Sequence, residues 1–328
     1  MRSSAPAHME KRLETILSLA LPYRETLTVR RTIYRGGAGP RVAVTAGMQG
    51  NELEGLYLCH RLAAWLEQLA QTRPEALLGQ VELYPALNPL GLDTLQRTLP
   101  VYDSDLDRSF PGHPQGLLPQ RIAAAVLAQL QGAALVIALQ ASDMHLREIP
   151  QARIEPRYAG KLLPLAQQLN LDLICLKEAA TVAETTLAHS LNVRGEPCLL
   201  VTTGSGMGLT RRHTGQLVAG ILQLWRELGV LASDLPLPAA EHDPLLVDAA
   251  QVHRLNAEVS GLFEPQAAPC GSRVKTGELL GSIVSPFEGR TLAEVRSPAT
   301  GLLATLRHYP LVYEGALLAR VAARPELS

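Results

Sequence analysis

The chain has 328 residues, of which 47% are hydrophobic, and its 31 acidic side chains nearly balance its 30 basic ones. This length predicts one large domain or two unequal domains with a substantial core, and the charge balance excludes a broad basic surface for nucleic acid. Charged residues make up 19% of the chain and no run of about 18 apolar residues occurs, so neither wholesale disorder nor a membrane span is expected.

The first two thirds of the chain alternate short apolar runs with helical spacing. Residues 26–36 alternate like a strand, and residues 41–47 (RVAVTAG) form a β-branched run typical of a buried strand. The turn GMQGNE follows, and residues 51–70 then place apolar side chains at helical spacing. Further strands are expected at 81–87, 134–140, 171–175 and 198–203, with helices near 115–131, 156–169 and 211–228. This order predicts a parallel or mixed sheet with helices on both faces.

The pattern changes after Val230. Residues 232–246 (ASDLPLPAAEHDPLL) are rich in proline and alanine and have no clear period, which predicts a linker. Residues 246–328 contain short apolar runs punctuated by glycine, as in a small all-β domain. We therefore expect two domains, at 1–235 and 246–328.

The four cysteines lie far apart and form no CxxC pair, which argues against a cysteine zinc site and favours reduced thiols. The start of the chain carries charges at Glu10, Lys11, Arg12 and Glu14, and it lacks the uninterrupted apolar core of a signal peptide. The sequence thus predicts a cytoplasmic protein, and it leaves open whether the chain forms a homo-oligomer.

Three turns that follow expected strands carry unusual polar content: GMQGNE at 47–52, SDMH at 142–145 and TTGSG at 202–206. A fourth polar segment covers 88–112. Functional groups of open α/β sheets gather at the carboxyl ends of strands, so these segments are expected to form the site.

These segments, in this order, resemble the motifs of the succinylglutamate desuccinylase/aspartoacylase family, which has the zinc carboxypeptidase fold. The matching stretches are GMQGNE at 47–52, NP at 88–89, DLDR at 105–108, FPG at 110–112 and DMH at 143–145, with SGLFEP at 260–265 and VKTGELLG at 274–281 in the tail. The resemblance spans residues 40–325. It implies a mixed sheet flanked by helices, followed by a smaller all-β domain.

The resemblance also implies a metal-dependent hydrolase that removes an acyl group from a small N-acyl amino acid-like substrate. Its zinc ligands are expected at Gln49, Glu52 and His145, and Gln49 replaces the family's first histidine. An amide oxygen is a neutral ligand, weaker than an imidazole nitrogen, so the site should hold zinc less tightly and shift its preference toward harder ions such as manganese. In the alternative interpretation, Gln49 caps the helix or bonds the turn and no metal is present.

Thr202 is a second departure from the family pattern. It stands at the catalytic position where the family has its general-base glutamate. Threonine cannot take a proton from water near pH 7, and the loss of a positioned base typically costs about 10²–10⁴ in rate.

The substrate-binding segment shows a third departure. The resemblance implies substrate contacts from Asn88, Asp107 and Arg108, and a catalytic role for Arg97 in polarising the scissile carbonyl. Arg108 offers the planar fork that suits a carboxylate, but Asp107 replaces the family's asparagine and would partly neutralise it. That change favours an amine or guanidine at the substrate end. Alternatively, Asp105 or Asp107 forms a salt bridge with Arg108 that holds the loop.

Two other functions stay open. Gln49 and Thr202 also fit a catalytically silent relative that binds a small ligand or a protein partner. In a third reading, the pocket serves another reaction, and His113 or His189 supplies the missing nitrogen.

Overall fold

The structure, a computed structural model, describes residues 9–22, 24–178, 184–266 and 269–323. Its strands are β1 (Glu10–Leu21), β2 (Arg24–Arg35), β3 (Arg41–Thr45), β4 (Gln80–Tyr84), β5 (Leu135–Ala141), β6 (Leu146–Ile154), β7 (Leu173–Leu176), β8 (Cys198–Gly204), β9 (Leu245–Asp248), β10 (Val252–Asn256), β11 (Gly261–Pro265), β12 (Arg273–Val274), β13 (Leu279–Ser285), β14 (Arg290–Arg296), β15 (Gly301–Arg307), β16 (Leu311–Val312) and β17 (Leu317–Ala323). Its α-helices are α1 (Leu53–Thr72), α2 (Pro89–Thr94), α3 (Leu118–Leu130), α4 (Ala159–Gln167), α5 (Leu187–Asn192) and α6 (Arg211–Glu227).

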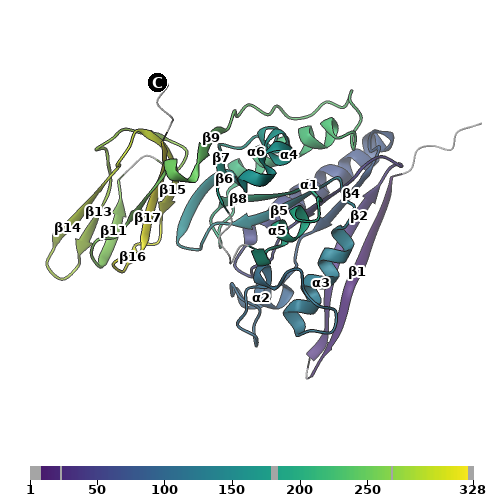
Figure 1. Ribbon diagram of the computed structural model, residues 1–328, viewed down its shortest axis with the longest axis horizontal. Coiled ribbons are helices and arrows are strands. Elements are labelled where there is room, and N and C mark those ends of the chain that lie inside the picture. The colour runs from purple at the N-terminus through teal and green to yellow at the C-terminus, as the bar shows by residue number, and fades with distance from the viewer. Residues whose placement is uncertain (1–8, 23, 179–183, 267–268, 324–328) are drawn as a thin grey trace, which may run out of the picture.

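Thirteen of these strands form one mixed sheet, whose main path is β1-β2-β4-β3-β5-β8-β6-β15-β17-β10. At its centre β3 pairs in parallel with β4 and β5, and β5 pairs in parallel with β8. Figure 1 shows β1 at one side of the molecule and the C-terminal strands at the other. The predicted α/β architecture, a mixed sheet flanked by helices with a further β-rich part, is confirmed.

Alternating side chains of the central strands serve two cores, one on each face of the sheet. Leu135 and Ile137 of β5 pack in the core that includes apolar residues of α1, α4 and α6. Val136 and Ala138 of the same strand pack in the core that includes residues of β1, α3 and α5. Because successive side chains of a strand point to opposite faces, this apolar run requires cover on both.

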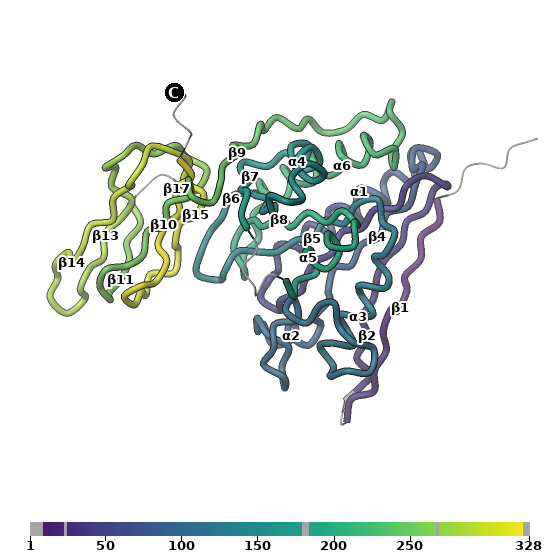
Figure 2. Tube along the Cα trace, in the orientation of Figure 1, coloured from purple at the N-terminus to yellow at the C-terminus, as the bar shows by residue number. Residues whose placement is uncertain are grey.

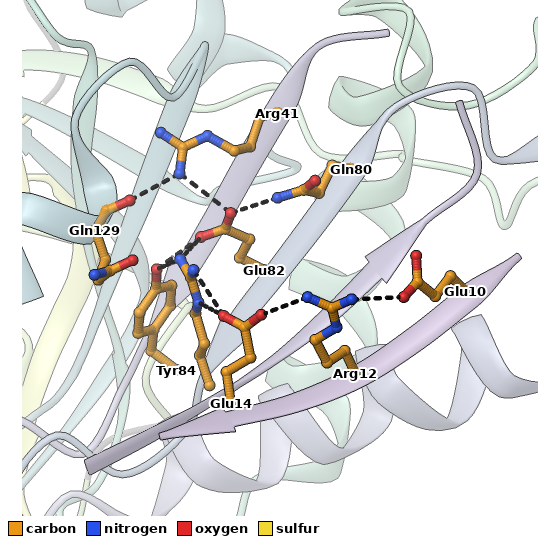
Figure 3. A network of polar contacts seen from close by, with 9 residues as sticks. Glu10, Arg12, Glu14, Arg41, Gln80, Glu82, Tyr84 and Gln129 are labelled. Atoms are coloured by element: carbon orange, nitrogen blue, oxygen red, sulfur yellow. Dashed lines mark hydrogen bonds and ion pairs between the residues drawn. The ribbon is translucent and has the colours of Figure 1, made fainter. Parts of the chain in front are cut away.

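A buried polar network fastens the β1–β2 hairpin to the sheet. The Glu82 carboxylate on β4 is 1% exposed and accepts hydrogen bonds from Arg31 Nη1 at 2.9 Å, Arg41 Nη1 at 3.1 Å and the Tyr84 hydroxyl at 2.6 Å. Arg31 also pairs with Glu14 on β1 at 2.9 Å. Figure 3 shows Arg41, Gln80 and Tyr84 around Glu82, with Glu14 alongside. Several charged hydrogen bonds to one carboxylate offset the cost of burying it.

The C-terminal part of the chain contributes to two sheets. Strands β10, β12, β15 and β17 continue the large sheet, and β11, β13, β14 and β16 form a separate antiparallel sheet of four strands. The link is an antiparallel pairing of β15 with the start of β6, in which Thr305 faces Glu148 and Arg307 faces Leu146. Figure 2 shows this part beside β6 and β7.

The expected division into domains 1–235 and 246–328 stays a prediction. Strand β9, at the end of the expected linker, pairs in parallel with β7 of the large sheet. The outermost residues of both expected domains, 1–8 and 324–328, lie outside the described residues. Within the described part of the chain, no helix is both long and apolar enough to cross a membrane.

Candidate functional site

The first polar turn, 47–52, connects β3 to α1 and packs against α2. Gly50 makes this contact possible, because a Cβ atom at that position would lie 1.9 Å from the carbonyl carbon of Gly91. A second glycine, Gly206, lies between the polar turns: its added Cβ would be 3.0 Å from the backbone oxygens of both Asn51 and Ser142. The turns after β3, β5 and β8 therefore adjoin one another at the carboxyl edge of the parallel strands.

Gln49 is buried in the first turn. Its side-chain Nε2 donates a hydrogen bond to Asp105 Oδ2 at 3.0 Å. Since a carboxylate only accepts hydrogen bonds, Asp105 fixes which end of the amide is nitrogen. The amide oxygen of Gln49 is then the end left for another partner.

Glu52 is 2% exposed. Its one hydrogen-bond donor among the described residues is the backbone N–H of Gln49, at 3.3 Å. Burial raises the pKa of Glu52 well above its usual range, and the nearby negative charge of Asp107 acts in the same direction. A carboxyl group this poorly partnered in the interior requires either a proton or a cation.

Asp105 is the hub of the neighbouring segment. Its carboxylate accepts from Arg97 Nη2 at 3.1 Å, and Arg108 Nε lies 3.9 Å away. Both guanidinium groups line a cavity of about 370 Å³ together with Asp105. Its remaining lining residues are Thr98, Asp103, Ser104 and Ser109. The structure thus places both arginines expected from the sequence beside one cavity.

His145 lies in the second polar turn, between β5 and β6. Its ring Nδ1 is 2.7 Å from Asp143 Oδ1, and its backbone N–H donates to the same oxygen at 2.9 Å. Burial favours a higher pKa of Asp143, but the two hydrogen bonds from His145 and the electrostatic interactions with His145 and Arg97 together lower that pKa. With Nδ1 bound to a carboxylate, Nε2 is the ring nitrogen left for another partner.

The described residues contain no cluster of three His, Cys, Asp or Glu side chains able to hold a metal ion. No hydrogen bond between described residues joins His145 to Gln49 or Glu52. A metal at these turns would need the Gln49 oxygen as its third protein donor, because the carboxylate and the imidazole supply only two.

Thr202 belongs to a polar row across three strands. It lies opposite Gln140 of β5 on one side and Gln151 of β6 on the other. Thr202 Oγ1 and Gln151 Nε2 are buried and have no partner among the described residues. Polar atoms that are buried and unpaired are rare in folded proteins, so Thr202 and Gln151 are candidates for contact with a polar ligand.

Asp107 faces this row and α5. One carboxylate oxygen accepts from Gln140 Nε2 at 2.9 Å and the other from the backbone N–H of Leu187 at 3.1 Å. Burial raises the pKa of Asp107 to about 6. No described ion pair joins it to Arg108, so of the two salt bridges expected as alternatives only the long one from Asp105 is present.

Asn88 is fully buried at the start of α2. Its Oδ1 accepts from the Gly91 N–H at 2.9 Å, which caps the helix, and its Nδ2 donates to Thr98 O at 3.4 Å. The structure gives Asn88 this capping role, and its expected substrate contact stays a prediction.

The two histidines considered as replacement ligands have other partners. His189 Nδ1 lies 3.0 Å from Glu155 Oε1, and His113 Nδ1 accepts from the Gln115 N–H at 3.2 Å. No described contact links either one to Glu52. A larger cavity, of about 750 Å³ and lined by Asp172, Arg212 and His213 among others, shares no residue with the polar turns.

Sequence reasoning missed two side chains. Glu54 is fully buried and accepts from the Thr210 N–H at 2.8 Å and Thr214 Oγ1 at 2.9 Å, so it joins the starts of α1 and α6. The sequence feature that could have identified Glu54 is an acidic residue on the apolar face of the expected helix. Tyr309, from the C-terminal part, packs its ring 5.0 Å from that of His145. No local motif marks it.

Comparison with known proteins gives a consistent picture. Residues 38–228 match the succinylglutamate desuccinylase/aspartoacylase catalytic domain. The chain is 25% identical over 304 residues to the N-alpha-acetyl-L-2,4-diaminobutyric acid deacetylase of Halomonas elongata, covering 89% of this chain and 84% of that protein.

Solved structures agree in fold. The product-bound ectoine utilization protein EutE of Ruegeria pomeroyi aligns with a TM-score of 0.80 and 21% identity, over 98% of this chain and 97% of its own. A succinylglutamate desuccinylase/aspartoacylase from Rhodobacter sphaeroides aligns with a TM-score of 0.78 and 23% identity, over 97% of this chain and 96% of its own.

Proposed function

Because the chain belongs to the succinylglutamate desuccinylase/aspartoacylase family, we propose that it hydrolyses the amide bond of a small N-acylated amino acid, with the aid of a divalent metal ion. Deacylation is the chemistry of the family and of the Halomonas elongata relative.

The observation that carries the proposal is the buried Glu52 carboxyl group with its single weak donor. It lies one turn from Gln49, whose amide oxygen is freed by the hydrogen bond to Asp105. These two oxygens and His145 Nε2 are the atoms that would hold a divalent ion, and such an ion supplies Lewis acidity to amide hydrolysis. Two oxygens and one nitrogen favour a harder ion than a site built on two imidazoles.

Arg97 and Arg108 are proposed to bind the substrate in the cavity that they line with Asp105. Arg97 stabilises negative charge that develops on the carbonyl oxygen, and Arg108 holds a carboxylate of the substrate. Thr202 Oγ1, buried and unpartnered, contacts the substrate and is not a base.

The acidic groups around the site favour a substrate that carries an amine. Asp105 lines the cavity and pairs with Arg97, and Asp107 and Asp143 lie close enough to Arg97 to interact with its charge. The Halomonas elongata relative acts on an acetylated diamino acid, which bears such an amine. N-acetyl-2,4-diaminobutyrate is accordingly the first substrate to test.

The test measures metal content and turnover together. Wild-type protein and the double variant Glu52→Ala/His145→Ala are loaded with zinc or manganese, dialysed, and assayed for bound metal by mass spectrometry. Glu155→Ala/His189→Ala is the control, because it also removes one carboxylate and one imidazole, here an ion pair outside the polar turns. The proposal expects metal loss only in the first variant. Equal metal content in all three proteins would rule the site out.

Turnover is then followed with N-acetyl-2,4-diaminobutyrate, N-acetylaspartate and N-succinylglutamate. Metal-dependent hydrolysis of any of the three supports the enzyme. The second candidate, a silent relative that binds a small ligand, is motivated by Gln49 and Thr202. It would instead show ligand-induced thermal stabilisation without hydrolysis.

The cytoplasmic location expected from the sequence stays a prediction. The four cysteines are all free in the structure.

A further inference from the structure

The turn that follows β15 in the C-terminal part lies directly against His145. The backbone N–H groups of His308 and Tyr309 donate to the backbone oxygen of His145 at 3.0 and 3.3 Å. Immediately beyond, Leu146 of β6 pairs with Arg307 of β15. Two residues far apart in the sequence are thus held together by a backbone contact that side-chain motion cannot break.

The side chains of His145 and Tyr309 are also in contact. The ring of Tyr309 meets that of His145 edge to face, with centroids 5.0 Å apart and an interplanar angle of 73°. Asp143 Oδ1 holds Nδ1 of the same imidazole at 2.7 Å. The hydrogen bond and the aromatic contact together restrict the rotation of the imidazole.

The turn that presents Tyr309 is itself held firmly. The Arg307 guanidinium donates to the backbone oxygens of Tyr309 at 2.9 Å, Leu311 at 3.0 Å and Leu317 at 3.3 Å. Pro310 directly follows Tyr309 and fixes its own backbone φ angle. Arg307 thus donates to backbone carbonyls of its own segment and stabilises the turn that carries Tyr309.

We propose that Tyr309 is a positioning residue for His145, so that the C-terminal part of the chain completes the metal-binding site without contacting the ion. The proposal rests on the proposed function, in which His145 Nε2 is a metal donor. The Tyr309 ring fixes the imidazole plane, and Asp143 fixes its tautomer. The Tyr309 hydroxyl has no hydrogen-bond partner among the described residues, so the ring face and edge carry the effect.

The experiment compares Tyr309→Leu, Tyr309→Phe and the control Tyr313→Leu, which alters an exposed tyrosine four residues further on. Manganese affinity is measured by titration calorimetry. Tyr309→Leu is expected to bind manganese about tenfold more weakly, as is usual when a group that orients a ligand is lost. Tyr309→Phe and Tyr313→Leu should match wild type. Equal affinity in Tyr309→Leu and wild type, or an equal loss in Tyr309→Phe, would overturn the proposal.

A second readout uses the metal-free protein, so that it does not depend on the proposed function. The backbone N–H of His145 shares Asp143 Oδ1 with the imidazole, so it reports how firmly the ring is held. Hydrogen exchange of this amide should speed up several-fold in Tyr309→Leu and stay unchanged in the other two variants. Wild type that binds no metal, combined with faster exchange in Tyr309→Leu, would sink the proposed function and keep the positioning role. Unchanged exchange together with intact metal binding would sink the positioning role alone.

Discussion

Gln49 Nε2 donates a hydrogen bond to Asp105 Oδ2 at 3.0 Å, and this contact decides which atom of the amide can face a ligand. An imidazole at position 49 could use the same carboxylate, with one ring N–H bound to Asp105 and the other nitrogen exposed. Asp105 is therefore already in place to orient a histidine ligand at position 49.

Gln49→His should strengthen zinc binding by tenfold or more. A neutral amide oxygen is replaced by an imidazole nitrogen, which zinc prefers, and Asp105 already stands ready to orient the ring. Competition with a chromogenic chelator measures the affinity. Gln49→Ala is the control and should weaken binding. An unchanged zinc affinity in Gln49→His would show that position 49 does not reach the ion.

Arg97 and Arg108 should affect different kinetic constants. Arg97→Ala removes the proposed oxyanion donor and is expected to lower kcat by about 10²–10³. Arg108→Ala removes a charge-assisted contact made equally in the ground state, worth about 1.5–3 kcal/mol, so KM should rise about tenfold or more with kcat little changed. Arg108→Lys keeps the charge without the fork and should fall between. Identical effects of both alanine variants on kcat would contradict these separate roles.

Asp107 should make the stability of the metal-free protein depend on pH. Its pKa is about 6 in the folded protein against about 3.9 in unfolded chains, so folding favours the protonated form. The resulting stabilisation is complete below pH 4 and is lost as pH rises through 6, a change of about 3 kcal/mol.

Asp107→Asn removes this dependence, since its amide can bond Leu187 and a flipped Gln140 without titrating. Urea denaturation of both proteins in chelator, from pH 4 to 7, measures the difference. The variant should gain stability relative to wild type over this interval. Parallel curves would contradict the raised pKa.

Arg31→Met should destabilise the protein by about 3 kcal/mol. It leaves the buried Glu82 carboxylate with one fewer cation, and this is the lower end of the range for a broken buried pair because Arg41 and Tyr84 still donate. The control is Arg12→Met, whose pairs with Glu10 and Glu14 lie at the surface and should contribute nothing measurable. Chemical denaturation measures both. Equal losses in the two variants would show that burial of Glu82 is not the cause.

The architecture could be predicted because the hydrophobic periodicity of a segment, and the glycine and proline residues that bound it, are local properties of the sequence. The run at 41–47 became β3, and the helical spacing from 51 to 70 became α1. Strand β1 was not predicted, because its first half carries the charges of Glu10, Lys11, Arg12 and Glu14 and a register shift near Ile16 breaks the alternation of its apolar half. Strand β6 was missed for a similar reason, since Arg147, Gln151 and Arg153 obscure its alternation.

The site was predictable only where residues lie in one turn. Gln49 and Glu52 share one turn, and the order of the polar turns predicted that the turn of His145 adjoins it, because the carboxyl ends of parallel strands meet at one edge of the sheet. Their role as metal ligands stays a prediction. The sequence could not show that Asp107 turns toward Gln140 and Leu187, or that Asn88 caps α2. Those directions depend on how the 88–112 segment packs on the sheet, which no spacing encodes.

The pairing of β15 with β6 has a consequence for the evolution of the chain. A polypeptide cut in the linker would leave residues 146–148 as a bare strand margin beside His145, open to association with any other extended peptide. A chain that lost its C-terminal part is therefore expected to aggregate, which is a physical reason for the two parts to be kept together. Mutations that loosen the pairing of β15 with β6 are expected to be selected against for the same reason.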